Sequence, residues 1–224
     1  MVNSKALLTR FYLFLLIVLI FRIPASAGEE TVIDKIAKDF KPIPGYLVKE
    51  IDDEYIIDLD QSHGVTIGDL FSVITVGEKL IHPVTKKVIG TLEQAKGILK
   101  VTRIKSGYSY ARPLTKEMDF KEGDPIRRYE NLRAVFWDYT DQGRMFYGQL
   151  QSALPGLKWQ DYDVAQRSKP KKPALVSNNG IDLYFILTPQ QIEVRDVQFY
   201  RLHGYHSPKF ISGAIPTIEK NETT

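Results

Sequence analysis

Cysteine is absent from this sequence of 224 residues, and its absence excludes several kinds of chemistry at once. A chain without cysteine forms no disulfide bond, no thiolate zinc site and no cysteine nucleophile. The folded state must therefore depend on an apolar core. With 43% hydrophobic and 11% aromatic residues, the composition is sufficient for one core of ordinary size or two small ones.

Long apolar runs are also missing, with one exception close to the N-terminus, at residues 11–21. This run is shorter than the roughly 20 residues that cross a bilayer. Basic residues precede it, and the small residues Ala25 and Ala27 follow it where a signal peptidase cuts. We therefore expect residues 1–27 to be a cleaved signal peptide and the mature chain to be periplasmic or otherwise exported. An uncleaved membrane anchor is the alternative, and membrane contact is expected only through this segment.

A basic excess is missing once this segment is removed. Without Lys5, Arg10 and Arg22, 27 basic residues remain against 27 acidic ones. Phosphate binding needs a clustered excess of Lys and Arg, so nucleic acid is not an expected partner.

The residues that remain begin with a short amphipathic helix and a proline-rich lead-in, expected over 28–44. Apolar residues recur on one helical face of 31–40, and Pro42 and Pro44 end the pattern. From 45 to 128, short apolar runs are separated by Gly, Pro or charged residues, which is typical of a small barrel or sandwich. We expect a small β-barrel, closed or partly open.

The stretch QSHGVTIGDLF, residues 61–71, has two interpretations: a phosphate-binding loop or a corner between two strands. A phosphate loop carries Gly-Lys-Ser/Thr before a helix, whereas Asp69 follows Gly68 here and a strand pattern comes next. The same Gly-Asp pair recurs in the segment 120–126, and we interpret both as barrel corners. The turn residues expected in the barrel are Gly64, Gly68, Asp69, Gly90, Gly123 and Asp124.

Residues 129–207 predict a small α+β domain. Strands are expected at 131–140, 181–188, 191–197 and 198–205, and a helix at 141–154. The polar, proline-broken stretch 167–174 is expected to be a linker, and 208–224 a flexible tail. The fold class is therefore mainly β with an α+β part.

Two aspartates are the best candidates for chemistry. Asp58 and Asp60 are two residues apart, so on a strand they share a face, as paired carboxylates in glycan hydrolysis require. Nothing in the neighbouring sequence is expected to shift one pKa away from the other, which favours a solvated face. His203 and His206 have the spacing of zinc ligands on a helix, but their context predicts a strand. We expect no catalytic, cofactor-binding or metal-binding residue.

Two other features suggest surfaces. Tyr108 and Tyr110 share a face of a predicted strand, where aromatic pairs bind partners or close a barrel end. The basic residues of the 167–174 stretch would contact anionic lipid or peptidoglycan, or would simply be solvated.

Residues of about 55–114 resemble the C-terminal domain of flagellar assembly protein T. The matching positions of its glycine corner, its hairpin and its closing strand are Gly64, Val65, Gly68, Asp69, Phe71, Val73, Pro83, Thr85, Ile89, Gly90, Val101, Tyr108 and Ser109. Lys86 stands where the family usually has glycine. The resemblance implies a small periplasmic β-barrel and a place in a flagellar basal-body assembly.

The sequence thus favours a non-catalytic periplasmic or cell-envelope protein. It would dock through its barrel onto an envelope assembly, with a protein partner contacted at Tyr108 and Tyr110. The alternative is an envelope glycan-binding module or a minor glycan hydrolase that uses Asp58 and Asp60.

Overall fold

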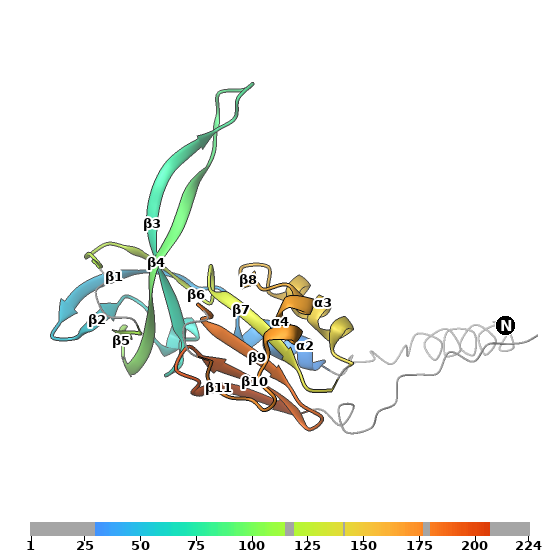
Figure 1. The fold of residues 1–224 in the computed structure, drawn as a ribbon. Helices are drawn as coiled ribbons and strands as arrows, with labels where there is room; N and C mark the ends of the chain where they lie inside the picture. The colour runs from blue at the N-terminus through green and yellow to red at the C-terminus, as the bar shows by residue number, and fades with distance from the viewer. Residues whose placement is uncertain (1–29, 115–118, 141, 177–179, 207–224) are drawn as a thin grey trace, which may run out of the picture. The chain divides into compact units, whose positions relative to one another are not determined.

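The computed structural model describes residues 30–114, 119–140, 142–176 and 180–206. They form a closed six-stranded barrel and a five-stranded sheet with helices, shown in Figure 1. The expected class, mainly β with a small barrel and an α+β part, is confirmed. The expected signal segment, with Ala25 and Ala27, and the expected tail lie outside the described residues.

The first described element is helix α2 (Val32–Asp39), close to the helix expected at 31–40. Its apolar face buries Ile36, and Phe40 is buried just after the helix ends. The ring centroid of Phe40 lies 4.3 Å from that of Tyr129. Because Ile36 and Phe40 belong to the same apolar cluster as the sheet, α2 is held by tertiary packing, as a helix this short requires.

The barrel strands are all antiparallel, and their spatial order is β1-β2-β5-β4-β3-β6, with β6 pairing back to β1. Every second side chain points inward, as the alternate burial of β2 and β6 shows. The strands are β1 (Pro44–Ile51), β2 (Glu54–Ile57), β3 (Leu70–Ile81), β4 (Val88–Lys105), β5 (Tyr108–Pro113) and β6 (Pro125–Arg128). Their inward side chains include Leu47, Ile57, Phe71, Val101 and Ile126.

The corner before β3 is built around Gly68, whose φ of 96° is in the left-handed region that favours glycine. Its N–H donates to the carbonyl of Val101, and the N–H of Val101 donates back to the carbonyl of Asp69. The Asp69 carboxylate accepts the N–H of Thr66 at 2.9 Å. The chain then enters a strand, not a helix, so this segment is a corner between strands.

The corner before β6 repeats this pattern. Gly123 has a φ of 84°, and its N–H donates to the carbonyl of Leu47, whose N–H donates back to Asp124. The Asp124 carboxylate accepts the N–H of Lys121 at 2.7 Å. The repeated Gly-Asp pair in the sequence therefore forms two corners, before β3 and before β6, that have the same pattern of hydrogen bonds.

The other two glycines expected at turns differ from each other. Gly64, with a φ of 81°, ends the short 3-10 helix η1 (Gln61–His63). Gly90 lies inside β4, opposite Leu80, so the turn expected at this glycine is wrong. The hairpin turns earlier in the chain, between Ile81 and Val88.

The second part of the chain is a five-stranded sheet in the order β11-β10-β9-β7-β8. The strands are β7 (Arg133–Asp138), β8 (Lys158–Trp159), β9 (Leu183–Leu187), β10 (Gln191–Asp196) and β11 (Arg201–His206). β7 pairs in parallel with β8 and with β9, and helices α3 (Arg144–Ala153) and α4 (Tyr162–Ser168) lie in the connections between these strands.

Helix α4 does not follow from the sequence pattern and occupies the start of the expected linker, 167–174. Its N-cap is Asp161, whose carboxylate accepts the N–H of Val164 at 3.0 Å. Lys169, directly after the helix, donates to the carbonyl of Asp138 and lies 5.1 Å from the centroid of the Tyr139 ring. This lysine is therefore part of the fold and not of a free linker.

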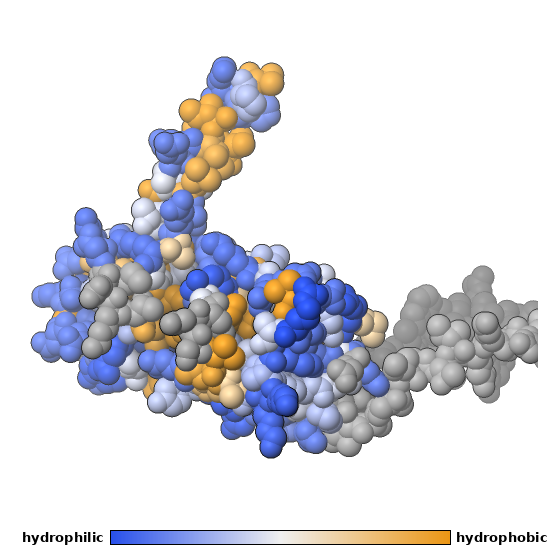
Figure 2. All heavy atoms as spheres, in the orientation of Figure 1, coloured by the Kyte–Doolittle hydropathy of each residue, from blue (hydrophilic) through white to orange (hydrophobic). Residues whose placement is uncertain are grey.

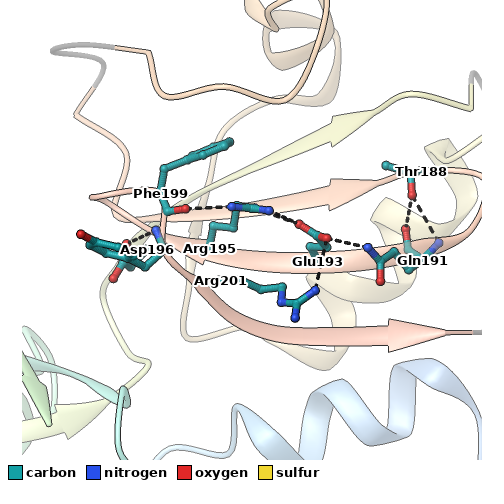
Figure 3. Close-up of polar contacts among 8 residues, drawn as sticks. Thr188, Gln191, Glu193, Arg195, Asp196, Phe199 and Arg201 are labelled. Atoms are coloured by element: carbon teal, nitrogen blue, oxygen red, sulfur yellow. Dashed lines mark hydrogen bonds and ion pairs between the residues drawn. The ribbon is translucent and has the colours of Figure 1, made fainter. Parts of the chain in front are cut away.

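Polar side chains order the end of β10 and the turn that follows it (Figure 3). Arg195 donates to the Glu193 carboxylate at 2.6 Å and to the carbonyl of Phe199 at 3.0 Å. Asp196, which is fully buried, accepts the N–H groups of Gln198 and Tyr200. The β10–β11 turn is therefore fixed by side chains of β10.

The barrel and the sheet share apolar packing. Leu70 of β3 and Ile98 of β4 belong to the same buried cluster as Leu183 and Phe185 of β9. Leu70 and Ile98 thus tie β3 and β4 to the sheet.

Candidate docking surface

The outer face of β1, β2, β5 and β4 carries tyrosine, arginine and aliphatic side chains together. The register places Ile56 beside Tyr110, and Tyr110 beside Arg103, on the side opposite the inward residues. Tyr46 and Val48, on β1, are exposed. We call this surface the tyrosine face and define it by Tyr46, Val48, Glu54, Ile56, Arg103, Tyr108, Tyr110 and Arg112.

Glu54 joins the two arginines of the tyrosine face. Its carboxylate is 2.6 Å from Arg103 Nη2 and 3.4 Å from Arg112 Nη2, and it accepts the Thr102 hydroxyl at 2.8 Å. Burial acts to raise the pKa of Glu54, but the donors Thr102 and Arg103 outweigh it and hold this pKa below its usual value. The arginines are thereby oriented while their side chains stay more than half exposed.

The two tyrosines expected at a partner surface lie against each other. Their ring centroids are 5.6 Å apart, and the guanidinium carbon of Arg103 lies 4.0 Å from the centroid of Tyr110. A hydrogen bond with Tyr110 raises the pKa of Tyr108. Both side chains are half-buried, so their rings are positioned before any partner arrives.

A second surface is the part of the β3–β4 hairpin that extends beyond the barrel, residues 75–96, which we call the arm (Figure 1). β6 pairs with β3 only at Phe71–Val73, and β5 pairs with β4 only from Leu99 onward. Within the described chain, the strands of the arm therefore pair only with each other, and both outer edges are open.

Large apolar side chains are exposed along the arm, as Figure 2 shows. Val84, at the turn, is 82% exposed, and Ile89 is 64% exposed. The other exposed apolar residues of the arm are Val76, Leu80, Ile81, Val88 and Leu92. A two-stranded ribbon without a core is only marginally stable in water, so such an arm is typical of a segment that is covered in use.

The turn at the end of the arm is well defined. The side chain of His82 accepts the N–H groups of Val84 and Thr85 at 3.2 and 3.1 Å, and the Lys86 N–H donates to the His82 carbonyl at 2.9 Å. Lys86 has a φ of 57°, a conformation that glycine adopts more easily. The position where the resembling family usually has glycine thus keeps a left-handed backbone with a lysine.

The two aspartates considered for glycan chemistry both accept hydrogen bonds from backbone N–H groups. Asp58 Oδ1 accepts the Tyr46 N–H at 2.7 Å. The Asp60 carboxylate accepts the Ser62 hydroxyl at 2.5 Å and the Gly107 N–H at 2.6 Å. These donors lower the pKa of Asp60, so the expectation that nothing nearby would shift it is wrong. A carboxyl with a lowered pKa is poorly suited to act as a general acid.

The histidines lie apart from one another. His203 is partly buried and lies against the Phe40 ring, with Asp39 Oδ2 3.8 Å from its Nδ1, and this burial lowers its pKa. His206 is exposed, and His63 Nδ1 is 2.9 Å from Asp60 Oδ1. Among the residues that the structure describes, no three His, Asp or Glu side chains are close enough to hold a metal ion.

A small cavity of about 140 Å³ lies between the first Gly-Asp corner and β11. Lys100, Arg201 and His203 line it. The Lys100 ammonium already pairs with Asp196 at 2.6 Å, and Arg201 with Glu193 at 3.7 Å. The cavity is therefore a gap at a packed junction whose charges are already engaged.

No family model matches this chain. It is similar to an uncharacterized protein of Aquifex aeolicus (strain VF5), with 29% identity over 114 residues that cover 51% of this chain. The match covers 22% of that relative, so it extends over only about a fifth of its length.

The arm is the surface that sequence reasoning missed. Gly77 and Gly90 look like breaks between short strands, although both lie inside long ones. The available signal was the pair of apolar runs on either side of Pro83, with no acidic residue from Lys79 to Leu92.

Proposed function

We propose that this chain is a non-catalytic protein of the cell envelope that docks onto a larger protein assembly through the tyrosine face of its barrel. The observation that carries the proposal is the grouping of Tyr46, Tyr108 and Tyr110 with two exposed arginines on one outer face. Tyrosine and arginine are enriched in protein interfaces and in the residues that dominate their binding energy.

The location of the protein in this proposal follows from the N-terminal pattern. A basic start, an apolar run and the small residues Ala25 and Ala27 support export. No helix in the described part of the chain has the length and apolar character to span a membrane. A flagellar basal-body assembly is the candidate that the resemblance of residues 55–114 supports.

The pre-ordering of the tyrosine face supports a binding role. Arg103 is held by Glu54 and stacked on Tyr110, so little side-chain entropy is lost when a partner binds. The alternative, glycan binding or hydrolysis by Asp58 and Asp60, is supported by no geometry, because both carboxylates accept backbone N–H groups.

The test is site-specific crosslinking in intact cells. A photoreactive amino acid replaces Tyr46, an exposed residue of the tyrosine face, and in a matched control it replaces Glu122, an exposed residue at the second corner. We expect one defined protein adduct from position 46 and none from position 122. The double substitution Tyr108→Ser and Tyr110→Ser should remove the adduct without changing the amount of protein.

Equal adducts from positions 46 and 122, or no adduct from position 46, would contradict the proposal. Mass spectrometry of the adduct identifies the partner, and a partner outside the flagellar basal body would reject that assembly while leaving the docking role.

A further inference from the structure

The outer part of the arm, residues 79–92, has a charge that differs from the rest of the chain. It contains Lys79, Lys86 and Lys87 and no aspartate or glutamate. The chain without its N-terminal 27 residues has equal numbers of basic and acidic residues. The outer arm is therefore a local concentration of positive charge on a balanced protein.

The same segment carries most of the exposed apolar residues of the arm. They are Leu80, Ile81, Val84, Val88, Ile89 and Leu92. The register pairs Ile81 with Val88 directly before the turn, so apolar side chains from both strands meet where the arm ends. Lys86 and Lys87 are within three residues of Val84. Aliphatic groups and ammonium groups thus occur together at one end.

The composition of residues 79–92 favours a lipid bilayer over a protein as the partner. Protein interfaces are enriched in Tyr, Trp, Phe, Met and Arg and depleted in Lys, and none of the enriched types occurs between Lys79 and Leu92. Surfaces that bind the edge of a bilayer combine aliphatic side chains, which enter the boundary between headgroups and acyl chains, with lysines that face anionic headgroups.

From the charge, the exposure and the composition, we infer that residues 79–92 bind the surface of an anionic phospholipid bilayer. The aliphatic side chains around Val84 enter the headgroup boundary, and Lys79, Lys86 and Lys87 contact the lipid phosphates. This adds a membrane contact to the one expected from residues 1–27. It is independent of the tyrosine face, whose residues lie on β1, β2 and β5 and, on β4, at Arg103, outside residues 79–92.

The geometry of the arm suits shallow insertion. Residues 75–81 span about 20 Å at the rise of a strand, so the turn reaches well beyond the barrel. The turn satisfies its own backbone groups through His82, which accepts two N–H groups and pairs with Lys87 and Lys86. Because these N–H groups are already bonded, the turn enters the headgroup boundary at smaller cost than a turn with unbonded N–H groups.

The absence of cysteine permits a test with a single reporter. The full chain with Thr85→Cys is labelled with an environment-sensitive fluorophore, and Glu122→Cys carries the same label as the control. Vesicles of phosphatidylglycerol with phosphatidylcholine are compared with vesicles of phosphatidylcholine alone. We expect a blue shift at position 85 with the anionic vesicles only, and an aqueous spectrum at position 122. Residues 1–27 are common to both proteins, so their contribution is controlled.

Substitutions in the labelled chain test separately how the lysine charges and the aliphatic side chains contribute to vesicle binding. Lys86→Gly removes a charge at a φ that glycine favours, and Lys87→Ser removes the neighbouring one. Each should weaken partitioning of the arm about fivefold. Val84→Asp with Ile89→Asp should abolish it, because carboxylates are repelled by anionic headgroups. Both positions are exposed, so the substitutions remove no buried contact. Lys121→Ser, at an exposed lysine outside residues 79–92, should change nothing.

Three results would overturn the inference. One is an aqueous spectrum at position 85 with both kinds of vesicle. The second is an equal shift at positions 85 and 122, which would assign the binding to another part of the chain. The third is a shift at position 85 that requires envelope protein instead of lipid. None of these results bears on crosslinking at the tyrosine face.

Discussion

Lys100 of β4 and Asp196 of β10 form an ion pair with 2.6 Å between Nζ and Oδ2, and this pair joins the barrel to the sheet. Asp196 is fully buried and also accepts the N–H groups of Gln198 and Tyr200, so one carboxylate holds both the β10–β11 turn and the barrel. Lys100 additionally lies 5.0 Å from the centroid of the Tyr200 ring. The barrel and the sheet are therefore joined by this ion pair as well as by shared apolar packing.

Removing one partner of this pair should destabilise the fold. Lys100→Met leaves a buried carboxylate without its cation, and we expect the free energy of unfolding to fall by about 2–3 kcal/mol, since Lys100 is partly exposed. Asp196→Asn should cost less in the Lys100→Met background than in the wild type. Urea unfolding measures all four proteins, and additive costs would contradict a coupled pair. Arg144→Met, at an exposed ion pair with Asp163, is the control and should cost under about 0.5 kcal/mol.

The two corner glycines should resist substitution because of their backbone conformation. Gly68→Ala and Gly123→Ala put a Cβ on residues with φ of 96° and 84°, and each should cost about 1–2 kcal/mol. No atom lies within 4 Å of a Cβ built on Gly123, so its cost would be strain alone. Gly148→Ala, inside α3 with open space around it, should instead stabilise by about 0.5–1 kcal/mol. If thermal unfolding showed a stability change of the same sign for all three variants, this explanation would be rejected.

The barrel corners and the strand alternation were predictable because they depend on neighbouring residues. Gly68-Asp69 and Gly123-Asp124 each need a left-handed glycine and a carboxylate that accepts an N–H three residues earlier, and both requirements are local. Helix α4 was not predictable in this way, since a helix of 7 residues has too few turns for a clear period.

The candidate surfaces depend on tertiary structure to different degrees. Tyr108 and Tyr110 share a strand face, and two-residue spacing alone predicted this. Arg103, Glu54 and Tyr46 join them only through strand pairing across the barrel. The arm depends on β3 and β4 continuing to pair beyond the core, although glycines interrupt the apolar pattern.

The stability of the fold should depend on pH through His203. Burial lowers its pKa, although Asp39 and Asp69 act in the opposite direction and Arg128 adds to the lowering. The unfolded chain therefore binds a proton near the ordinary value of about 6.5, before the folded chain does. Stability should be complete above that pH and fall as the pH decreases through 6.5 toward the folded pKa. His203→Gln should flatten this decrease in urea titrations at a series of pH values, whereas His206→Gln, at an exposed site, should leave it unchanged.

The turn of the arm offers a prediction in which two neighbouring lysines respond with opposite signs. Lys86 holds a φ of 57°, which costs about 1 kcal/mol for a residue with a Cβ, so Lys86→Gly should stabilise the turn. Lys87 is not among the residues of positive φ, and Lys87→Gly should only add flexibility to the unfolded hairpin and weaken it. The His82 N–H donates to the Lys87 carbonyl across the turn, so its amide exchange reports the opening directly. We expect slower exchange of this amide in Lys86→Gly and faster exchange in Lys87→Gly. If both substitutions accelerated exchange alike, the left-handed conformation at Lys86 would not be what limits the stability of the turn.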